Sequence, residues 1–113
     1  MLVRVGPLPE DPLAAAAAFH VDVLPRVIAA LDGGAALLTL VFTPAGHPHR
    51  AWREAAIQTI ARERTPARIN AVASADEPAI AAAHAFIAAA PGLTGHYLLL
   101  DSHGAGPVIS SPA

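Results

Sequence analysis

The stretch that decides the fold is AALLTLVF at residues 35–42, which carries no charged side chain. A continuous apolar run of this length is typical of a parallel strand that is covered on both faces. The segment Asp32-Gly33-Gly34, directly before it, contains a glycine pair of the kind that ends a helix. We therefore expect a central strand at 35–42, in a sheet with helices on both sides.

Upstream of this strand, the sequence predicts a short strand at 2–5 and then a long helix. Asp11 is a good N-cap residue, and a proline such as Pro12 is tolerated in the first turn of a helix. The alanine and leucine content of 13–31 predicts a helix over that range. Pro25 removes a backbone donor, so we expect it to kink or divide this helix.

Downstream, two helices alternate with two strands. Pro48 opens a helix that runs to Arg64, with apolar residues at helical spacing and charged residues expected to fill the remaining face. A strand is predicted at 68–73. Ser74-Ala75-Asp76-Glu77 matches a capping box ahead of a helix at 79–90. The last predicted strand covers 96–100.

Strands and helices alternate along the whole chain, with short connections that require parallel pairing and right-handed crossovers. The expected fold class is α/β: a three-layer α/β/α half-Rossmann arrangement of about four parallel strands and three helices. We expect one domain over 1–113, with residues 100–113 as a partly ordered tail.

Composition excludes several classes of function. The hydrophobic share is 54% and the charged share 14%, so the chain is too apolar for disorder. A net charge of −2 gives no electrostatic case for nucleic acid. Without cysteine, thiolate metal sites and disulfides are excluded. Asp32 and Gly33-Gly34 interrupt the longest apolar candidate, Val27 to Phe42, so no membrane span is expected. The start lacks a signal-peptide pattern, so the expected location is cytoplasmic.

Several segments, taken in order, resemble the C-terminal half of the short-chain dehydrogenase/reductase family. The segments are Gly33-Gly34 before the apolar strand, Thr43-Pro44-Ala45-Gly46 after it, Ala61-Arg62-Glu63, the stretch RINAVA at 68–73, Leu93-Thr94-Gly95, and the strand ending Leu100-Asp101. The resemblance covers nearly the whole chain and begins at about the family's fourth strand. It implies a truncated Rossmann-type domain.

The family binds NAD(P) through a glycine-rich turn between its first strand and helix, where the pyrophosphate approaches the backbone. This sequence has no such segment. Its nearest equivalent, Gly104-Ala105-Gly106, is followed by Pro107 and by too little chain for a helix. No cofactor is therefore expected, unless a partner supplies the half that binds NAD(P).

The resemblance also implies where the family's catalytic positions fall. The serine position falls on Thr43, the asparagine position on Asp22, and the tyrosine and lysine positions on Arg50 and Glu54. A guanidinium is always protonated, and a carboxylate raises the pKa of a nearby acid, so neither replacement can perform the original task. The sequence predicts a catalytically degenerate member of the family.

Other candidate residues have simpler interpretations. His47 and His49 could share a metal ion, but the sequence offers no third ligand at a spacing typical of a metal site. We therefore expect exposed loop histidines. His20 and His84 are expected to be packing or interface residues, and Trp52 an interface or core anchor. The triad-like run Asp101-Ser102-His103 cannot align as a triad, because neighbouring residues in extended chain point to opposite faces.

Two functions are expected from these observations, and a remnant without a selected role is a third reading. The first is a non-catalytic pseudoenzyme or accessory subunit. The resemblance implies that its two long helices, 11–31 and 48–64, pair in a dimeric four-helix bundle, so a homodimer or a complex with a full-length relative is expected. The alternative is an oxidoreductase subunit or ligand-binding module. It would use a cleft at the strand ends, with Thr43, Asp22, Arg50 and Ser74 around it and NAD(P) supplied by a partner.

Overall fold

The computed structural model describes residues 1–100, and its centre is one parallel sheet. The strands are adjacent in the order in which they occur along the chain, and all pairs are parallel. Their bounds are β1 Leu2–Arg4, β2 Leu37–Phe42, β3 Arg68–Ala73 and β4 Tyr97–Leu99. The predicted parallel order is confirmed, and the predicted bounds of β3 agree with those observed.

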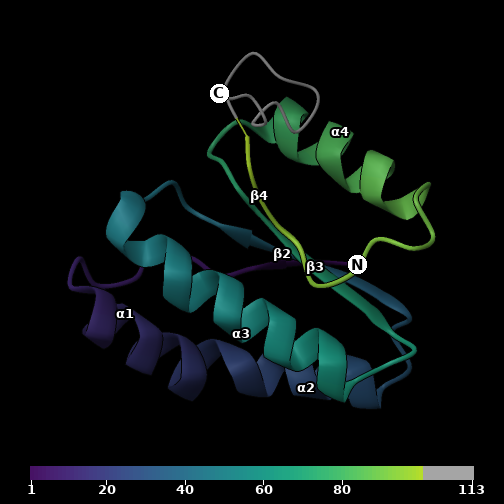
Figure 1. Cartoon of the computed structure of the whole chain (residues 1–113), viewed down its shortest axis with the longest axis horizontal. Coiled ribbons are helices and arrows are strands. Elements are labelled where there is room, and N and C mark those ends of the chain that lie inside the picture. The colour runs from purple at the N-terminus through teal and green to yellow at the C-terminus, as the bar shows by residue number, and fades with distance from the viewer. Residues whose placement is uncertain (101–113) are drawn as a thin grey trace.

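Helices cover both faces of the sheet and complete three layers (Figure 1). The bounds are α1 Pro12–Ala18, a π-helical turn Phe19–Val23, α2 Leu24–Asp32, a 3₁₀ turn His47–His49, α3 Arg50–Glu63 and α4 Glu77–Ala88. Figure 1 shows α1, α2 and α3 side by side on one face and α4 alone on the other. The predicted α/β/α class is confirmed.

The alternation of side chains along β2 divides the core in two. Leu38, Leu40 and Phe42 belong to the larger cluster, which lies under α1, α2 and α3. Val41 belongs to the smaller cluster, which lies under α4 and includes Ile80. Both faces of β2 are therefore buried, which explains why its sequence is apolar except at Thr39.

The long N-terminal helix changes its hydrogen bonding just before Pro25. The N–H of Leu24 donates to the carbonyl of Phe19, which is the spacing of a π-helix. The chain stays helical from Pro12 to Asp32. The expected interruption at Pro25 thus takes the form of a π turn directly before the proline.

This helix, Pro12–Asp32, is the one helix within residues 1–100 that is long and apolar enough to cross a membrane. Counting only uninterrupted apolar runs missed it, because Asp22 and Arg26 lie inside the segment. Its buried residues recur about every fourth position, at Ala15, Phe19, Val23 and Val27, and pack toward the sheet. A core helix passes the same test of length and composition as a membrane span.

One of the two predicted helix caps is confirmed and the other is wrong. Asp11 caps α1 by accepting a hydrogen bond from the N–H of Ala14 at 3.0 Å. The N-cap of α4 is Asp76, whereas Ser74 accepts from the N–H of Asp76 and forms a turn before the helix. Glu77 therefore does not close a capping box. Its carboxylate pairs instead with Arg4 on β1, at 2.8 Å.

Candidate functional site

The carboxyl ends of the parallel strands meet at one edge of the sheet, where two hollows lie next to each other. The first measures about 240 Å³ and is lined by Leu8, Pro9, Glu10, Thr43, Pro44, Ala45, Gly46, His49 and Arg53. The second measures about 320 Å³ and is lined by Pro44, Ser74, Ala75, Asp76 and Leu100. Sites in open parallel sheets form at this edge, so the residues around the two hollows are the first candidates for function.

Arg53 of α3 forms part of the wall of the first hollow, and only 2% of its surface is exposed. Its Nη1 donates to the carbonyl oxygen of Thr43 and to the hydroxyl of Tyr97, both at 3.0 Å. The guanidinium carbon lies 4.4 Å from the centre of the Phe42 ring. Among residues 1–100, no carboxylate pairs with Arg53, and its buried Nε has no hydrogen-bond partner.

The position of Arg53 along α3 explains its burial. It precedes Ala56, Ile57 and Ile60 at helical spacing, so it belongs to the stripe that faces the sheet. The expectation that charged residues of this helix fill only its outer face is therefore wrong for Arg53. A charge on an otherwise apolar stripe is the sequence signal that could have revealed it.

His49 is buried, with 8% of its surface exposed, whereas His47 is exposed. The prediction of two exposed loop histidines is therefore wrong for His49. The Nε1–H of Trp52 donates to Nδ1 of His49 at 3.1 Å, so the ring proton of His49 lies on Nε2, which bonds the carbonyl of Glu10 at 2.9 Å. Both ring nitrogens are already used, which leaves this imidazole no lone pair for a metal ion.

The four positions expected from the family catalytic set do not form a common site. Arg50 and Glu54 pair with each other at 3.3 Å, one turn apart on α3. The side chain of Thr43 is exposed, and it is the backbone carbonyl of this residue that binds Arg53. Asp22 is exposed on the π turn and lines neither hollow at the strand ends.

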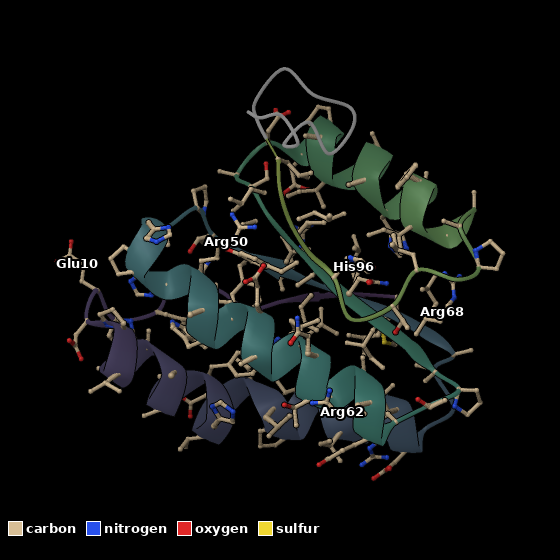
Figure 2. All side chains as sticks on the ribbon, viewed as in Figure 1. Glu10, Arg50, Arg62, Arg68 and His96 are labelled. Carbon is tan, nitrogen blue, oxygen red and sulfur yellow. The ribbon has the colours of Figure 1, made fainter. Side chains whose placement is uncertain are left out.

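The side-chain view shows where Arg50 lies along α3 relative to the first hollow. Figure 2 shows Glu10 and Arg50 toward the end where α3 begins and Arg62 toward the other end. Arg50 does not line the first hollow, whereas Glu10 does. Of the residues expected around the cleft, Thr43 and Ser74 are at the strand ends, each beside a different hollow.

The segments that carry the family resemblance hold the scaffold together. Arg68 donates from Nη1 to the carbonyls of Ile87 and Ala90, at the end of α4. The amide of Asn70 bridges the connection to β4, donating to one backbone carbonyl and accepting from the N–H of His96. Thr94 Oγ1 accepts a hydrogen bond from the backbone N–H of Ile69. These side chains fix how α4 and β4 join the sheet.

The fold and these motifs agree with a comparison with known families. A family model described as short chain dehydrogenase-like protein matches residues 3–100. The chain belongs to this family. No curated protein and no solved structure gives a significant match.

In this short-chain dehydrogenase-like chain, the sequence contains no lysine, so the lysine of the family's catalytic pair has no counterpart in any alignment. Its one tyrosine, Tyr97, is buried in β4 and bonds Arg53. The predicted coincidental run Asp101-Ser102-His103 and the glycine pair of Gly104-Ala105-Gly106 lie outside the described residues, as does nearly all of the predicted tail.

A third hollow, away from the strand ends, lies between the N-terminal helix and α3. It measures about 370 Å³ and is mostly apolar, being lined by His20, Leu24, Ile28, Trp52, Ala55, Ala56, Thr59, Ile60, Glu63 and Arg64. We call it the helix groove. Trp52 is half-buried at one end, where its ring packs against Phe19, and thereby anchors the groove to the core.

His20 and His84, the two histidines on helices, lie beside oxygen atoms, as expected of satisfied packing or interface residues. Nδ1 of His20 lies 2.7 Å from the carbonyl of Ala16, one turn earlier. Nδ1 of His84 on α4 lies 3.1 Å from the hydroxyl of the buried Thr39. Burial lowers the pKa of His84 below its usual value, and the N-terminal ammonium of Met1 lowers it further.

Proposed function

We propose that this chain is a non-catalytic member of the short-chain dehydrogenase-like family that acts by association, and that a second copy of the chain covers its helix groove. The observation that carries the proposal is the apolar N-terminal helix. Only 22% of its most apolar window is buried, and Leu13 and Val21 are 82% and 72% exposed. Exposed apolar surface favours an interaction, and Leu24 and Ile28 of the same helix line the groove.

The lack of catalysis is supported by the chemistry of α3. Hydride exchange with a carbonyl group needs a proton donor beside the reacting oxygen. At the family's positions for that donor and its helper, this chain has Arg50 and Glu54, which neutralise each other. The buried hydroxyl of Tyr97 accepts a hydrogen bond from a permanent cation and lies on a strand, not on α3. Neither arrangement supplies a proton to a bound substrate.

A second copy is favoured as the occupant because the helix groove is complementary to itself. His20 and Trp52 are at one end, and Glu63 and Arg64 are at the other. A two-fold axis would place each end against the opposite end of the partner, so that Glu63 meets the basic edge of His20. The middle of the groove exposes small side chains, Ala55 and Thr59, which let helices approach closely.

A lipid bilayer is the competing occupant, and the charges of the helix argue against it. Asp22 and Arg26 are exposed near the middle of the apolar segment, where a membrane would have to bury both. In a dimer of two such helix pairs, the same charges can remain at the solvent-exposed rim.

The test compares two variants, each with glutamate in place of an exposed alanine, by size-exclusion chromatography with light scattering. Ala55→Glu places a charge in the helix groove, whereas Ala85→Glu places the same charge on the exposed face of α4. We expect the wild type and Ala85→Glu to be dimers at micromolar concentration and Ala55→Glu to be a monomer, since burying an unpaired charge weakens association at least about a hundredfold.

Four results would overturn the proposal. A wild-type monomer that floats with phosphatidylcholine vesicles would favour the membrane, and a wild-type monomer that does not float would leave the groove without its proposed occupant. Tight binding of NADH or NADPH by the isolated chain, followed through the nicotinamide fluorescence, would contradict the non-catalytic assignment. Dimers of equal stability in both variants would place the interface elsewhere.

A further inference from the structure

We propose that the hollow at the end of β2 binds the carboxylate group of a small organic acid, with Arg53 as the anchor. This ligand site is separate from the helix groove and does not depend on dimer formation. This site is supported by the buried guanidinium, by its unused donors, and by the charge and size of the hollow.

The guanidinium of Arg53 is an uncompensated buried charge. Buried arginines are normally paired with a carboxylate, because removing a charge from water is costly. Here the partners within residues 1–100 are one carbonyl, one hydroxyl and aromatic rings, of which Phe42 is the nearest. Cation–π contact offsets part of the cost but supplies no negative charge. An anion from outside would complete the site.

The unused donors of Arg53 have the geometry that a carboxylate needs. Both hydrogen bonds to Thr43 and Tyr97 leave from Nη1. The Nε–H and the Nη2 group share one edge of the guanidinium plane and bind no acceptor among residues 1–100, and of the two Nε is buried away from solvent. Two parallel N–H groups match the two oxygens of a carboxylate in a bidentate pair.

Charge and size favour a small monocarboxylate over phosphate. Glu10 lies at the rim with an exposed side chain, so a dianion would leave excess negative charge beside it. A monoanion would neutralise Arg53 alone. About 240 Å³ holds a ligand of only a few carbon atoms, and Leu8, Pro9 and Pro44 provide an apolar wall for them.

Two neighbouring features support the same assignment. The 14-residue helix α3 begins at this hollow without a side-chain cap, so its positive end adds to the field of Arg53. His49 is held by Trp52 and by the carbonyl of Glu10, so it shapes the wall without competing for the anion. Arg53 is therefore the group on which recognition depends.

The experiment titrates the ¹⁵N-labelled full chain with propanoate and butanoate, and in parallel with propanamide and butanamide. The readouts are the Nε–H resonance of Arg53 and the fluorescence of the single tryptophan, Trp52, whose ring lies 5.8 Å from the guanidinium carbon. We expect saturable shifts with a carboxylate at millimolar concentration and at least about tenfold weaker effects with the matching amide. Inorganic phosphate should bind more weakly than either acid.

Variants sharpen the result. Arg53→Gln should abolish the response, whereas Arg50→Gln, which removes an exposed arginine one turn away, should leave it unchanged. Glu10→Gln should tighten carboxylate binding about twofold to threefold at low salt, because it removes a like charge at the rim. The wild-type comparison of acid with amide does not require any variant to fold.

The proposal is overturned by any of the following results. Acids and amides could act equally, or no saturable shift could occur up to about 50 mM ligand. Phosphate could bind more tightly than the acids. The wild type could fail to bind while Asp101→Asn alone shifts the Arg53 resonance, which would assign the counter-ion to the chain itself. Binding retained by a folded Arg53→Gln variant would remove Arg53 as the anchor.

Discussion

The two hollows that border α3 differ in what they leave unsatisfied. The helix groove, lined by Ala55, Thr59 and their apolar neighbours, leaves carbon surface open to solvent. The hollow at the end of β2 leaves a cation, Arg53, without an anion. Exposed apolar surface favours association with another protein surface, whereas an unpaired buried charge favours binding of a ligand of opposite charge.

Of the four positions expected from the family's catalytic set, only Thr43 lines one of these two hollows. Arg50 and Glu54 lie on the same helix as Arg53, and the two are paired with each other near the surface. The comparison teaches that residues three positions apart on one helix can have opposite roles. Four experiments test this contrast, from the largest expected effect to the smallest.

The largest effect is expected from alanine substitution of the two arginines. Arg53→Ala should lower the free energy of unfolding by about 3 kcal/mol, because it leaves a cavity beside Phe42 and removes the donor to the Thr43 carbonyl and to the buried Tyr97 hydroxyl. Arg50→Ala should change the same quantity by less than about 0.5 kcal/mol, since exposed ion pairs contribute little. Urea unfolding followed by circular dichroism measures both. Equal effects of the two substitutions would contradict the burial of Arg53 and the exposure of Arg50.

A smaller loss is expected from Tyr97→Phe. Removing the hydroxyl takes away one acceptor of Arg53 Nη1 but leaves the ring against Phe42, so the free energy of unfolding should fall by about 1 kcal/mol. Chemical denaturation of the variant provides the value. A neutral substitution would mean that the hydroxyl does not contribute to holding the guanidinium.

The elements of this fold were predictable where local sequence decides them. The apolar run of β2 and the apolar residues Ile69 and Val72 predicted the two central strands, and Asp11 predicted the start of α1. The start of α4 was not predicted, because Ser74 and Asp76 are both competent caps and lie two residues apart. The choice depends on where β3 ends, which local propensity leaves open.

The site at the strand ends was predicted only in outline. Sequence reasoning identified the edge and two of its residues, Thr43 and Ser74, but missed Arg53 and expected His49 to be exposed. The burial of both depends on distant partners. Arg53 binds Tyr97, 44 positions later, and His49 binds the carbonyl of Glu10, 39 positions earlier. No local pattern encodes these two contacts, although the place of Arg53 on the apolar stripe of α3 is a local signal of its burial.

Salt should separate the two hollows further. Raising sodium chloride from about 0.05 to 0.5 M should weaken carboxylate binding at Arg53 about threefold, through screening and competition by chloride. Association through the helix groove should be unchanged or slightly stronger, because it depends on apolar burial. The titration and the light-scattering experiment, repeated at both salt concentrations, give the comparison. If carboxylate binding and chain association weakened together, the two hollows would not be independent.

The smallest effect concerns His84, on the other face of the sheet. Because its pKa is lowered in the folded chain, the unfolded chain binds the proton first as the pH falls through 6.5. Stability should therefore be fully present above pH 6.5 and should decline slightly below it. His84→Gln should remove this part of the pH dependence while retaining a polar contact to Thr39. The midpoint of urea unfolding between pH 5 and 8 measures the difference, and identical slopes would exclude His84 as the cause.

The central claim is that this short-chain dehydrogenase-like domain retains the family's association surface and has lost its chemistry. The most direct test is the molar mass of the purified chain, measured by light scattering at micromolar concentration. The account predicts twice the chain mass of 11.5 kDa, reduced to 11.5 kDa by Ala55→Glu. A wild-type chain that stays at 11.5 kDa throughout would contradict it.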